Sequence, residues 1–240
     1  MKPRVTLRKA LEDPELLGSA LAGPTWHAWR GILLAAIGEP LTKDELKTFT
    51  TFTGRTTPTS QRVDELWCCV GRRGGKSRAK VLLDYAEGTL QSTPILRQLL
   101  ESRTKDTLTL TTGITLEVRS ASFRRIRGVT CVAVLADECA FWMSDESANP
   151  DVEILKAARP ALATTQGPLI AISSPYARRG ALWDTYKKHF GPEGDPTILV
   201  AQGSTRGFNP ELPQSIIYKA MDRDPAAAEE RDIMRNAARN

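Results

Sequence analysis

The most regular feature of the chain is a set of four unbroken apolar runs, each bounded by polar residues. They lie within the predicted strands 64–70, 131–136, 168–173 and 197–202, and the first of them is Leu66 to Val70. Runs of this length without alternation are typical of strands that are buried on both faces of a parallel sheet. Apolar residues at helical spacing fill 76–90, 150–165 and 180–190 between them. Strands that alternate with helices predict an α/β fold with a mostly parallel central sheet flanked by helices.

The remaining segments predict smaller elements around this core. Alternating residues on either side of Gly113 predict a β-hairpin from 107–110 and 114–119. The polar, threonine-rich stretch 48–60 predicts a loop. Further helices are expected at 8–22, 25–37, 94–102, 213–222 and 225–238. We therefore divide the chain into an N-terminal helical region and linker packing on the core (1–60), the core itself (61–208) and a C-terminal helical linker (209–240).

Composition is that of an ordinary globular protein and limits the class. The 240 residues are 41% hydrophobic and 25% charged, and no apolar run approaches the ~18 residues that cross a bilayer. No apolar segment follows Met1 to Arg4, so we do not expect a secretory signal. We expect the protein to lie in the cytoplasm. Four cysteines lack the spacing of metal ligands, and we expect buried or half-buried free thiols. They are Cys68, Cys69, Cys131 and Cys139.

Arginine dominates a net charge of +5 and occurs in clusters. A polyanion such as nucleic acid or a nucleotide is the natural partner of such clusters. A solvated basic surface explains the charge alone about equally well. The clusters are Arg72/Arg73, Arg124/Arg125/Arg127 and Arg178/Arg179.

A glycine-rich turn follows the first apolar strand and reads Val70-Gly71-Arg72-Arg73-Gly74-Gly75-Lys76-Ser77. Such a loop surrounds phosphates with backbone N–H groups, and the next helix points its positive dipole end at them. Lys76 would reach the β- and γ-phosphates of a nucleotide, and the Ser77 hydroxyl would bind Mg²⁺. Val70 stands where the usual pattern has its first glycine, and Gly71 comes one position late.

Two adjacent carboxylates, Asp137 and Glu138, end the apolar strand 131–136. An acid at the tip of a core strand is where phosphate-loop enzymes hold Mg²⁺, so Asp137 is the candidate metal ligand. Glu138 is the candidate general base for the attacking water. The alternative is that the pair only caps the next helix.

Hydroxyls end the next strand at Ser173 and Ser174, before Pro175. Either serine could sense a γ-phosphate, or the two could simply open a turn. Arginines crowd the segment 120–128 just before the Asp-Glu strand. One of them could act on a neighbouring subunit's phosphate as an arginine finger, or the segment could face DNA, or both.

In this order, the phosphate-loop, Ser-Phe-Arg-Arg-Ile-Arg-Gly, Leu-Ala-Asp-Glu-Cys-Ala-Phe-Trp and Ile-Ser-Ser-Pro motifs resemble the ATPase domain of the large terminase subunit of tailed bacteriophages. The resemblance covers the chain from about Trp26 to the C-terminal helix. Terminases commonly lack the first glycine and carry an arginine within the loop, here Arg72 or Arg73. By the family pattern, Arg127 matches the trans-acting finger, and Ser173 and Ser174 match the motif that couples hydrolysis to movement.

The resemblance implies a P-loop NTPase fold of the ASCE type, ATP and Mg²⁺ as cofactors, and an ATPase that packages DNA. The implied partners are double-stranded DNA, a homo-oligomeric ring of five subunits, the portal protein and the small terminase subunit, with no membrane. The implied location is the cytoplasm of an infected bacterium, transiently on the procapsid. Trp29-Arg30 lie where the family has an aromatic-Gln motif beside adenine, although a buried tryptophan explains Trp29 equally well.

Two departures from the family pattern bear on function. The family's nuclease domain is not found after Phe208-Asn209-Pro210, so nuclease activity is not expected from this chain. Lys76 and Asp137 are only 61 positions apart, where the family has an additional strand and helix. A natural internal deletion or a degenerate prophage copy would explain the short interval, and if the strand is absent the sheet has one strand fewer. The alternatives are a helicase-like DNA translocase and a shortened, inactive nucleotide- or DNA-binding prophage remnant. Cys139-Ala140 after the Asp-Glu pair argues against the helicase group.

Overall fold

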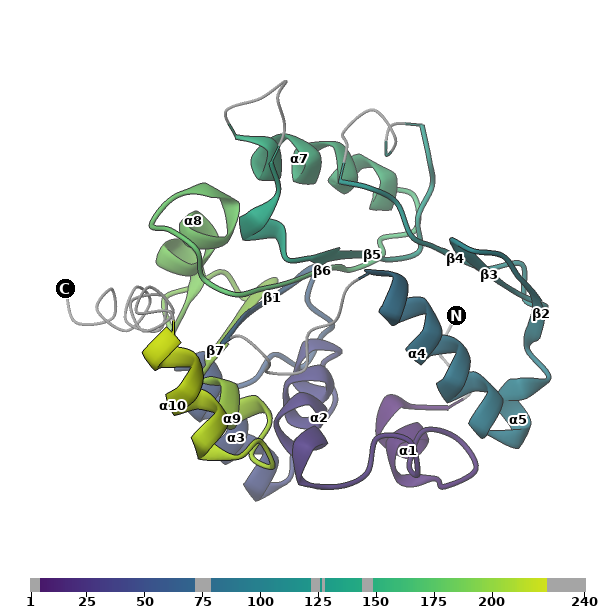
Figure 1. The fold of residues 1–240 in the computed structure, drawn as a ribbon, viewed down its shortest axis with the longest axis horizontal. Coiled ribbons are helices and arrows are strands. Elements are labelled where there is room, and N and C mark those ends of the chain that lie inside the picture. The colour runs from purple at the N-terminus through teal and green to yellow at the C-terminus, as the bar shows by residue number, and fades with distance from the viewer. Residues whose placement is uncertain (1–4, 72–78, 122–125, 127, 144–148, 224–240) are drawn as a thin grey trace.

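A parallel four-stranded sheet forms the centre of the protein (Figure 1). The computed structural model describes residues 5–71, 79–121, 126, 128–143 and 149–223. The strands are β1 (Glu65–Val70), β5 (Val134–Asp137), β6 (Leu169–Ser173) and β7 (Ile198–Gly203), and their order is β5-β6-β1-β7. All three pairings are parallel, which confirms the predicted α/β fold with a parallel sheet.

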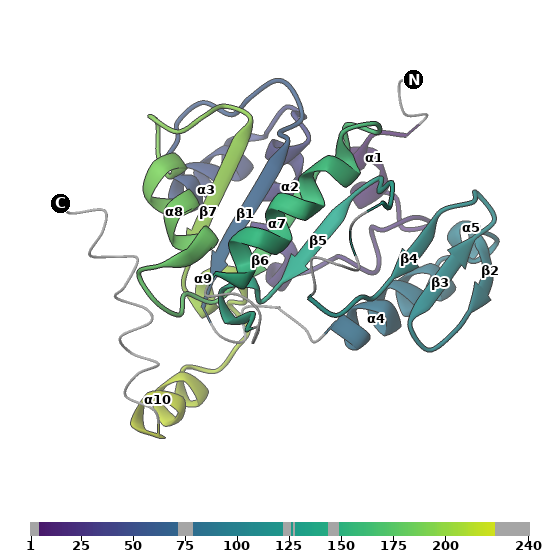
Figure 2. The same ribbon diagram turned by 90° about the horizontal axis from the view of Figure 1, so that it is seen from above.

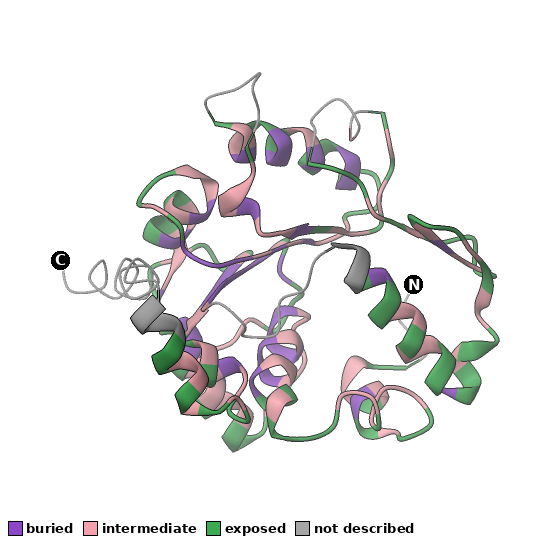
Figure 3. Ribbon diagram, in the orientation of Figure 1, coloured by how far each residue is buried: buried purple, intermediate pink, exposed green. Residues whose placement is uncertain are grey.

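Strand β1 is buried on both faces, as its unbroken apolar run predicts. Leu66, Cys68 and Val70 face one helical layer, whereas Trp67 and Cys69 face the other. The first layer consists of α2 (Pro24–Ala36) and α3 (Lys43–Thr53); the second consists of α7 (Pro150–Leu162) and α8 (Gly180–His189). Figure 3 shows the buried residues concentrated where these helices meet the sheet.

The chain after β7 returns to the first helical layer before it leaves the core. The short helix α9 (Thr205–Phe208) places the fully buried Phe208 ring against Trp29 and Phe52, with ring centroids 4.5 and 4.7 Å apart. Helix α10 (Gln214–Arg223) then projects from the body, as Figure 2 shows. The expected helix at 225–238 lies outside the described residues.

A second, antiparallel sheet lies beyond the β5 side of the central sheet (Figure 1). It is built from β2 (Leu100–Arg103), β3 (Thr107–Leu110) and β4 (Thr115–Glu117), in the order β2-β3-β4. The β3–β4 pair confirms the predicted hairpin. Helix α4 (Ala79–Ser92) and the single turn α5 (Pro94–Arg97) lead into this sheet, and Arg103 ties β2 to α4 through Asp84 and Glu87.

Three secondary-structure predictions were wrong. Residues 48–53 belong to α3, because a capping box between Thr42 and Glu45 starts a helix that buries Phe49 and Phe52 three residues apart. The expected helix 94–102 stops at Arg97, and its end pairs with β3 as strand β2. The first helix, α1 (Leu7–Glu12), ends before Pro14, since proline removes a backbone donor inside a helix.

Strand β5 is an edge strand, with β6 as its partner in the central sheet. Within the described part of the chain no strand pairs with its outer edge. Leu135, on the β5 face that turns away from α7, is 65% exposed. This exposure is unusual for a core strand and shows that the described residues leave this face of β5 largely uncovered.

The cysteines are free, as expected, and Cys68, Cys69 and Cys139 are buried. Burial raises the pKa of the Cys68 and Cys139 thiols to about 12, so both stay protonated at neutral pH. Among the described helices, none has the length and apolar character needed to span a bilayer.

Arg55 joins the end of α8 to the start of β7 through its guanidinium, and its removal should lower stability. Its guanidinium, in a residue only 8% exposed, donates to the carbonyls of His189, Gly191, Asp195 and Ile198 at 2.9–3.1 Å. Arg55→Ala removes these donors and leaves carbonyls unsatisfied, so we expect a loss of about 2–4 kcal/mol in the free energy of unfolding, measured with urea. Arg97→Ala, at an exposed arginine, is the control and should change stability by less than about 0.5 kcal/mol. Equal stability of the two variants would contradict this role of Arg55.

Candidate functional site

The carboxyl ends of the four parallel strands bring the described candidate residues together at one edge of the sheet. In register, Cys69 at the end of β1 lies beside Ser173 of β6 and Gln202 of β7, and Asp137 of β5 lies beside Ile172. Ligands of open α/β sheets bind outside this edge. The strand order therefore assembles Gly71, Asp137, Glu138, Ser173 and Ser174 into one candidate site.

Gly71 begins the glycine-rich segment under a steric constraint. Its N–H extends the ladder between β1 and β7 by donating to the Gly203 carbonyl at 3.2 Å. A Cβ atom at Gly71 would lie 2.6 Å from Thr205 Oγ1 and 2.7 Å from the Thr205 backbone nitrogen. Glycine is therefore required one position after the place where the usual pattern has it. Arg72, Arg73, Gly74, Gly75, Lys76 and Ser77 lie outside the described residues, as does Arg127.

Glu138 turns the chain sharply at the end of β5. Its backbone is left-handed, with φ 52° and ψ 39°, a conformation that costs a non-glycine residue on the order of 1 kcal/mol. Its N–H donates to the Ile172 carbonyl at 2.7 Å, so the turn is fixed to β6. The short helix η1 (Cys139–Phe141) follows, and the Glu138 side chain makes no capping hydrogen bond to it. This argues against the alternative that Glu138 only caps a helix.

The Glu138 carboxylate is held by the tip of the neighbouring strand. Its Oε2 atom accepts from the Ser174 N–H at 3.2 Å. The single proton of the Ser173 hydroxyl is shared between Oε2, at 3.3 Å, and the Ser174 carbonyl, at 3.0 Å. The Ser173 hydroxyl also accepts from the Ala140 N–H at 3.2 Å. Both serines are buried, at 0% and 1% exposure, so these bonds are shielded from water. The serines thus do more than open a turn, since they connect the tip of β6 to the carboxylate of β5.

Asp137 is anchored through its backbone at the same place. The Trp142 indole N–H donates to the Asp137 carbonyl at 3.0 Å, across the turn that Glu138 makes. Asp137 is half-buried at the strand tip. Carboxylate and hydroxyl oxygens are the ligands that Mg²⁺ prefers, and Asp137 supplies such a donor at this edge.

Asp151 is a site residue that the sequence analysis missed. It is buried in the first turn of α7, and its Oδ2 atom accepts from the Ala181 N–H at 2.6 Å, at the start of α8. Gly180 allows this contact, because its φ is +83° and a Cβ atom there would lie 2.4 Å from Oδ2. Asp151 thereby fixes the end of the segment that leads from Ser174 into α8. The only hint in the sequence was the glycine after Arg178-Arg179.

Two other features lie apart from the strand tips. The Trp29 ring packs against Phe208 in the core, which favours the buried interpretation of Trp29 over an adenine contact. A surface hollow of about 740 Å³ lies between α7 and the segment 126–130, with Glu153 and Lys156 in its wall. None of the described strand-tip residues lines this hollow.

A scan against models of known protein families gave no match, and no curated protein matched the sequence significantly. The motifs and the geometry at the carboxyl edge of the sheet are therefore the features of the chain that bear on its function.

The contact between Gly71 and Thr205 predicts opposite effects of two glycine substitutions. Gly71→Ala forces a methyl group against the Thr205 backbone and should lower the free energy of unfolding by about 1–3 kcal/mol. Gly88→Ala places the same methyl in open space on α4 and should raise it by about 0.5–1 kcal/mol. Urea unfolding of both variants measures the difference. A Gly71→Ala protein as stable as the wild type would contradict the close approach.

Proposed function

We propose that the chain is an ATP-hydrolysing P-loop motor domain that drives double-stranded DNA into a phage procapsid, like the ATPase domain of large terminases. The observation that carries the proposal is the contact of Glu138 with Ser173 and Ser174 at the strand tips. Gly71, the Asp137-Glu138 pair and the Ser173-Ser174 pair lie at the ends of three different strands and share one edge. The motifs alone did not require this.

The strand order supports the finer fold assignment. In the ASCE type of P-loop NTPase an additional strand separates the phosphate-loop strand from the strand that carries the acids, and a glutamate serves as base. Here β6 lies between β1 and β5, and β5 ends in Asp137 and Glu138. We therefore propose an ASCE-type sheet that lacks one outer strand.

Each candidate residue has a role in this proposal. ATP, when bound, supplies the γ-phosphoryl group that is transferred to water, and Mg²⁺ neutralises its charge. Lys76 and Ser77 would hold phosphate and Mg²⁺, and Asp137 would complete the metal site. Glu138 would accept the proton of the attacking water, and Arg127 would act on the nucleotide of a neighbouring subunit.

The assembly follows from the trans-acting role of Arg127. A finger supplied by a neighbour requires at least one adjacent subunit. By the resemblance to terminases we propose a ring of subunits, docked on a portal with DNA in its pore and recruited with a small terminase subunit. The infected cell's cytoplasm is the corresponding location.

A shortened, inactive remnant is the second candidate, and the exposed Leu135 on the open edge of β5 favours it. Steady-state phosphate release by the purified chain, with and without DNA, separates the two. A motor domain that needs a neighbour's arginine should be slow when dilute and faster when concentrated. A remnant should release no phosphate at any concentration.

Glu138→Gln tests the assignment of the base. Glutamine keeps an oxygen that can accept from Ser173 and Ser174 but cannot take a proton from water, so ATP turnover should fall at least ~100-fold while ATP binding remains. Phosphate release and nucleotide affinity are the two measurements. Glu101→Gln, on exposed β2, is the control and should behave as the wild type. Normal turnover by Glu138→Gln would refute this role.

Ser173→Ala tests whether the serine positions the base. Loss of one hydroxyl contact to Glu138 should lower kcat about tenfold and leave the dissociation constant of ATP unchanged. Ser204→Ala is a matched control, because Ser204 follows β7 at the same edge but its hydroxyl oxygen accepts from the Gly207 N–H instead. Ser173→Ala and Ser204→Ala should each lose about 1 kcal/mol in the free energy of unfolding. If kcat falls equally in the two variants, Ser173 acts only through the stability of the fold.

A further inference from the structure

Two adjacent arginines, Arg178 and Arg179, lie on the segment that connects Ser174 to α8. Both are exposed. The Arg178 guanidinium lies over the Trp183 ring, 5.8 Å from its centre. This cation–π contact holds the side chain and does not use the guanidinium's hydrogen-bond donors. Within the described residues neither arginine has a hydrogen-bond or ion-pair partner.

Most other described arginines already hold a partner inside the protein. Carboxylates neutralise Arg8, Arg103, Arg119 and Arg159, and backbone carbonyls bind Arg55, Arg62 and Arg206. Near Arg178 and Arg179, the Asp151 carboxylate is buried against the Ala181 N–H. Asp184 is the exposed acid on α8, and the exposed Lys187 and Lys188 outweigh it. Among the residues that the structure describes, no carboxylate therefore pairs with either arginine, and the exposed charge around them is mainly basic.

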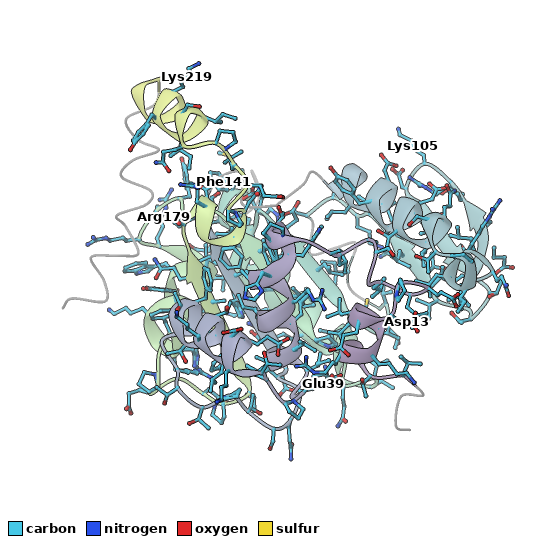
Figure 4. The ribbon with its side chains drawn as sticks, turned by 90° about the horizontal axis from the view of Figure 1, so that it is seen from below. Asp13, Glu39, Lys105, Phe141, Arg179 and Lys219 are labelled. Atoms are coloured by element: carbon cyan, nitrogen blue, oxygen red, sulfur yellow. The ribbon has the colours of Figure 1, made fainter. Side chains whose placement is uncertain are left out.

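An aromatic pair borders these arginines. The rings of Tyr176 and Phe141 lie 4.9 Å apart, and Tyr176 is 52% exposed. This contact braces the segment after β6 against the turn after β5. Figure 4 shows Phe141 and Arg179 on the side of the molecule from which α10 projects, away from Glu39. The tyrosine and the arginines are thus presented together beside the carboxyl edge of the sheet.

We propose that Tyr176, Arg178 and Arg179 contact the sugar–phosphate backbone of double-stranded DNA; the proposal rests on the motor function and names where its substrate binds. A guanidinium donates two parallel hydrogen bonds to a phosphate, and a tyrosine hydroxyl is a common donor to the same oxygens. These contacts are independent of base sequence, as translocation along any DNA requires.

The position of the segment in the chain links DNA to the proposed base. Arg178 follows Ser174 by four residues, and Ser174 donates its N–H to Glu138. The Phe141–Tyr176 contact joins the same segment to the residues after Glu138. A phosphate held at Arg178 and Arg179 therefore pulls on both sides of the Glu138 carboxylate, and DNA at this surface changes the rate of hydrolysis.

Fluorescence anisotropy with a labelled 30-base-pair duplex tests the contact. The double variant Arg178→Ala/Arg179→Ala should weaken binding about 10- to 60-fold at 0.1 M salt, and the slope of log affinity against log salt should fall by about two. The control Arg97→Ala/Lys105→Ala removes the same charge from exposed positions in α5 and in the β2–β3 turn and should bind nearly as the wild type. DNA-independent phosphate release should be the same in this control and in the wild type.

The outcomes separate this proposal from the motor function. Wild-type affinity in the double variant, an equal loss in the control, or no duplex binding by the wild type would each overturn the contact. Tighter binding of the corresponding single strand would overturn the assignment to duplex DNA. Duplex binding that depends on both arginines, in a chain that releases no phosphate, would support the contact and refute the motor function.

Discussion

The parallel pairing of β6 with both β1 and β5 is the constraint on which the site depends. It places Ser173 beside the end of the strand that leads into the glycine-rich segment, and it places the Ile172 carbonyl where Glu138 must turn. The left-handed backbone at Glu138 is stabilised by that hydrogen bond and by the two contacts of the carboxylate. Without β6 between them, the acids and the glycine-rich segment would lie on strands with no shared partner.

The sheet also determines which of the surrounding segments contact one another. Asp151 fixes the start of α8, and the Phe141–Tyr176 contact joins the turns after β5 and β6. The segment with Arg178 and Arg179 is thus held at both ends by groups that contact the site or its strands. The outer edge of β5 is the opposite case, because no described strand pairs with it and Leu135 of β5 is 65% exposed.

Much of this architecture could be predicted from the sequence, since unbroken apolar runs mark buried parallel strands and carboxylates or hydroxyls at their ends mark the functional edge. The helix at Lys43–Thr53 could have been found from the Thr42–Glu45 capping box, although its threonines favoured a loop. The contact between Glu138 and Ser173 could not, because the order of parallel strands is a property of tertiary packing. The pairing of Asp151 with α8 was hidden for the same reason.

We propose that the carboxyl edge of this sheet holds a nucleoside triphosphate. A crystal structure of the chain with Mg²⁺ and a non-hydrolysable ATP analogue tests this proposal most directly. We expect the triphosphate to lie at the end of β1, with its terminal phosphate facing Glu138 and with Ser173 and Ser174 beside it. An analogue that fails to bind, or that binds in the hollow beside α7, would contradict nucleotide binding at this edge.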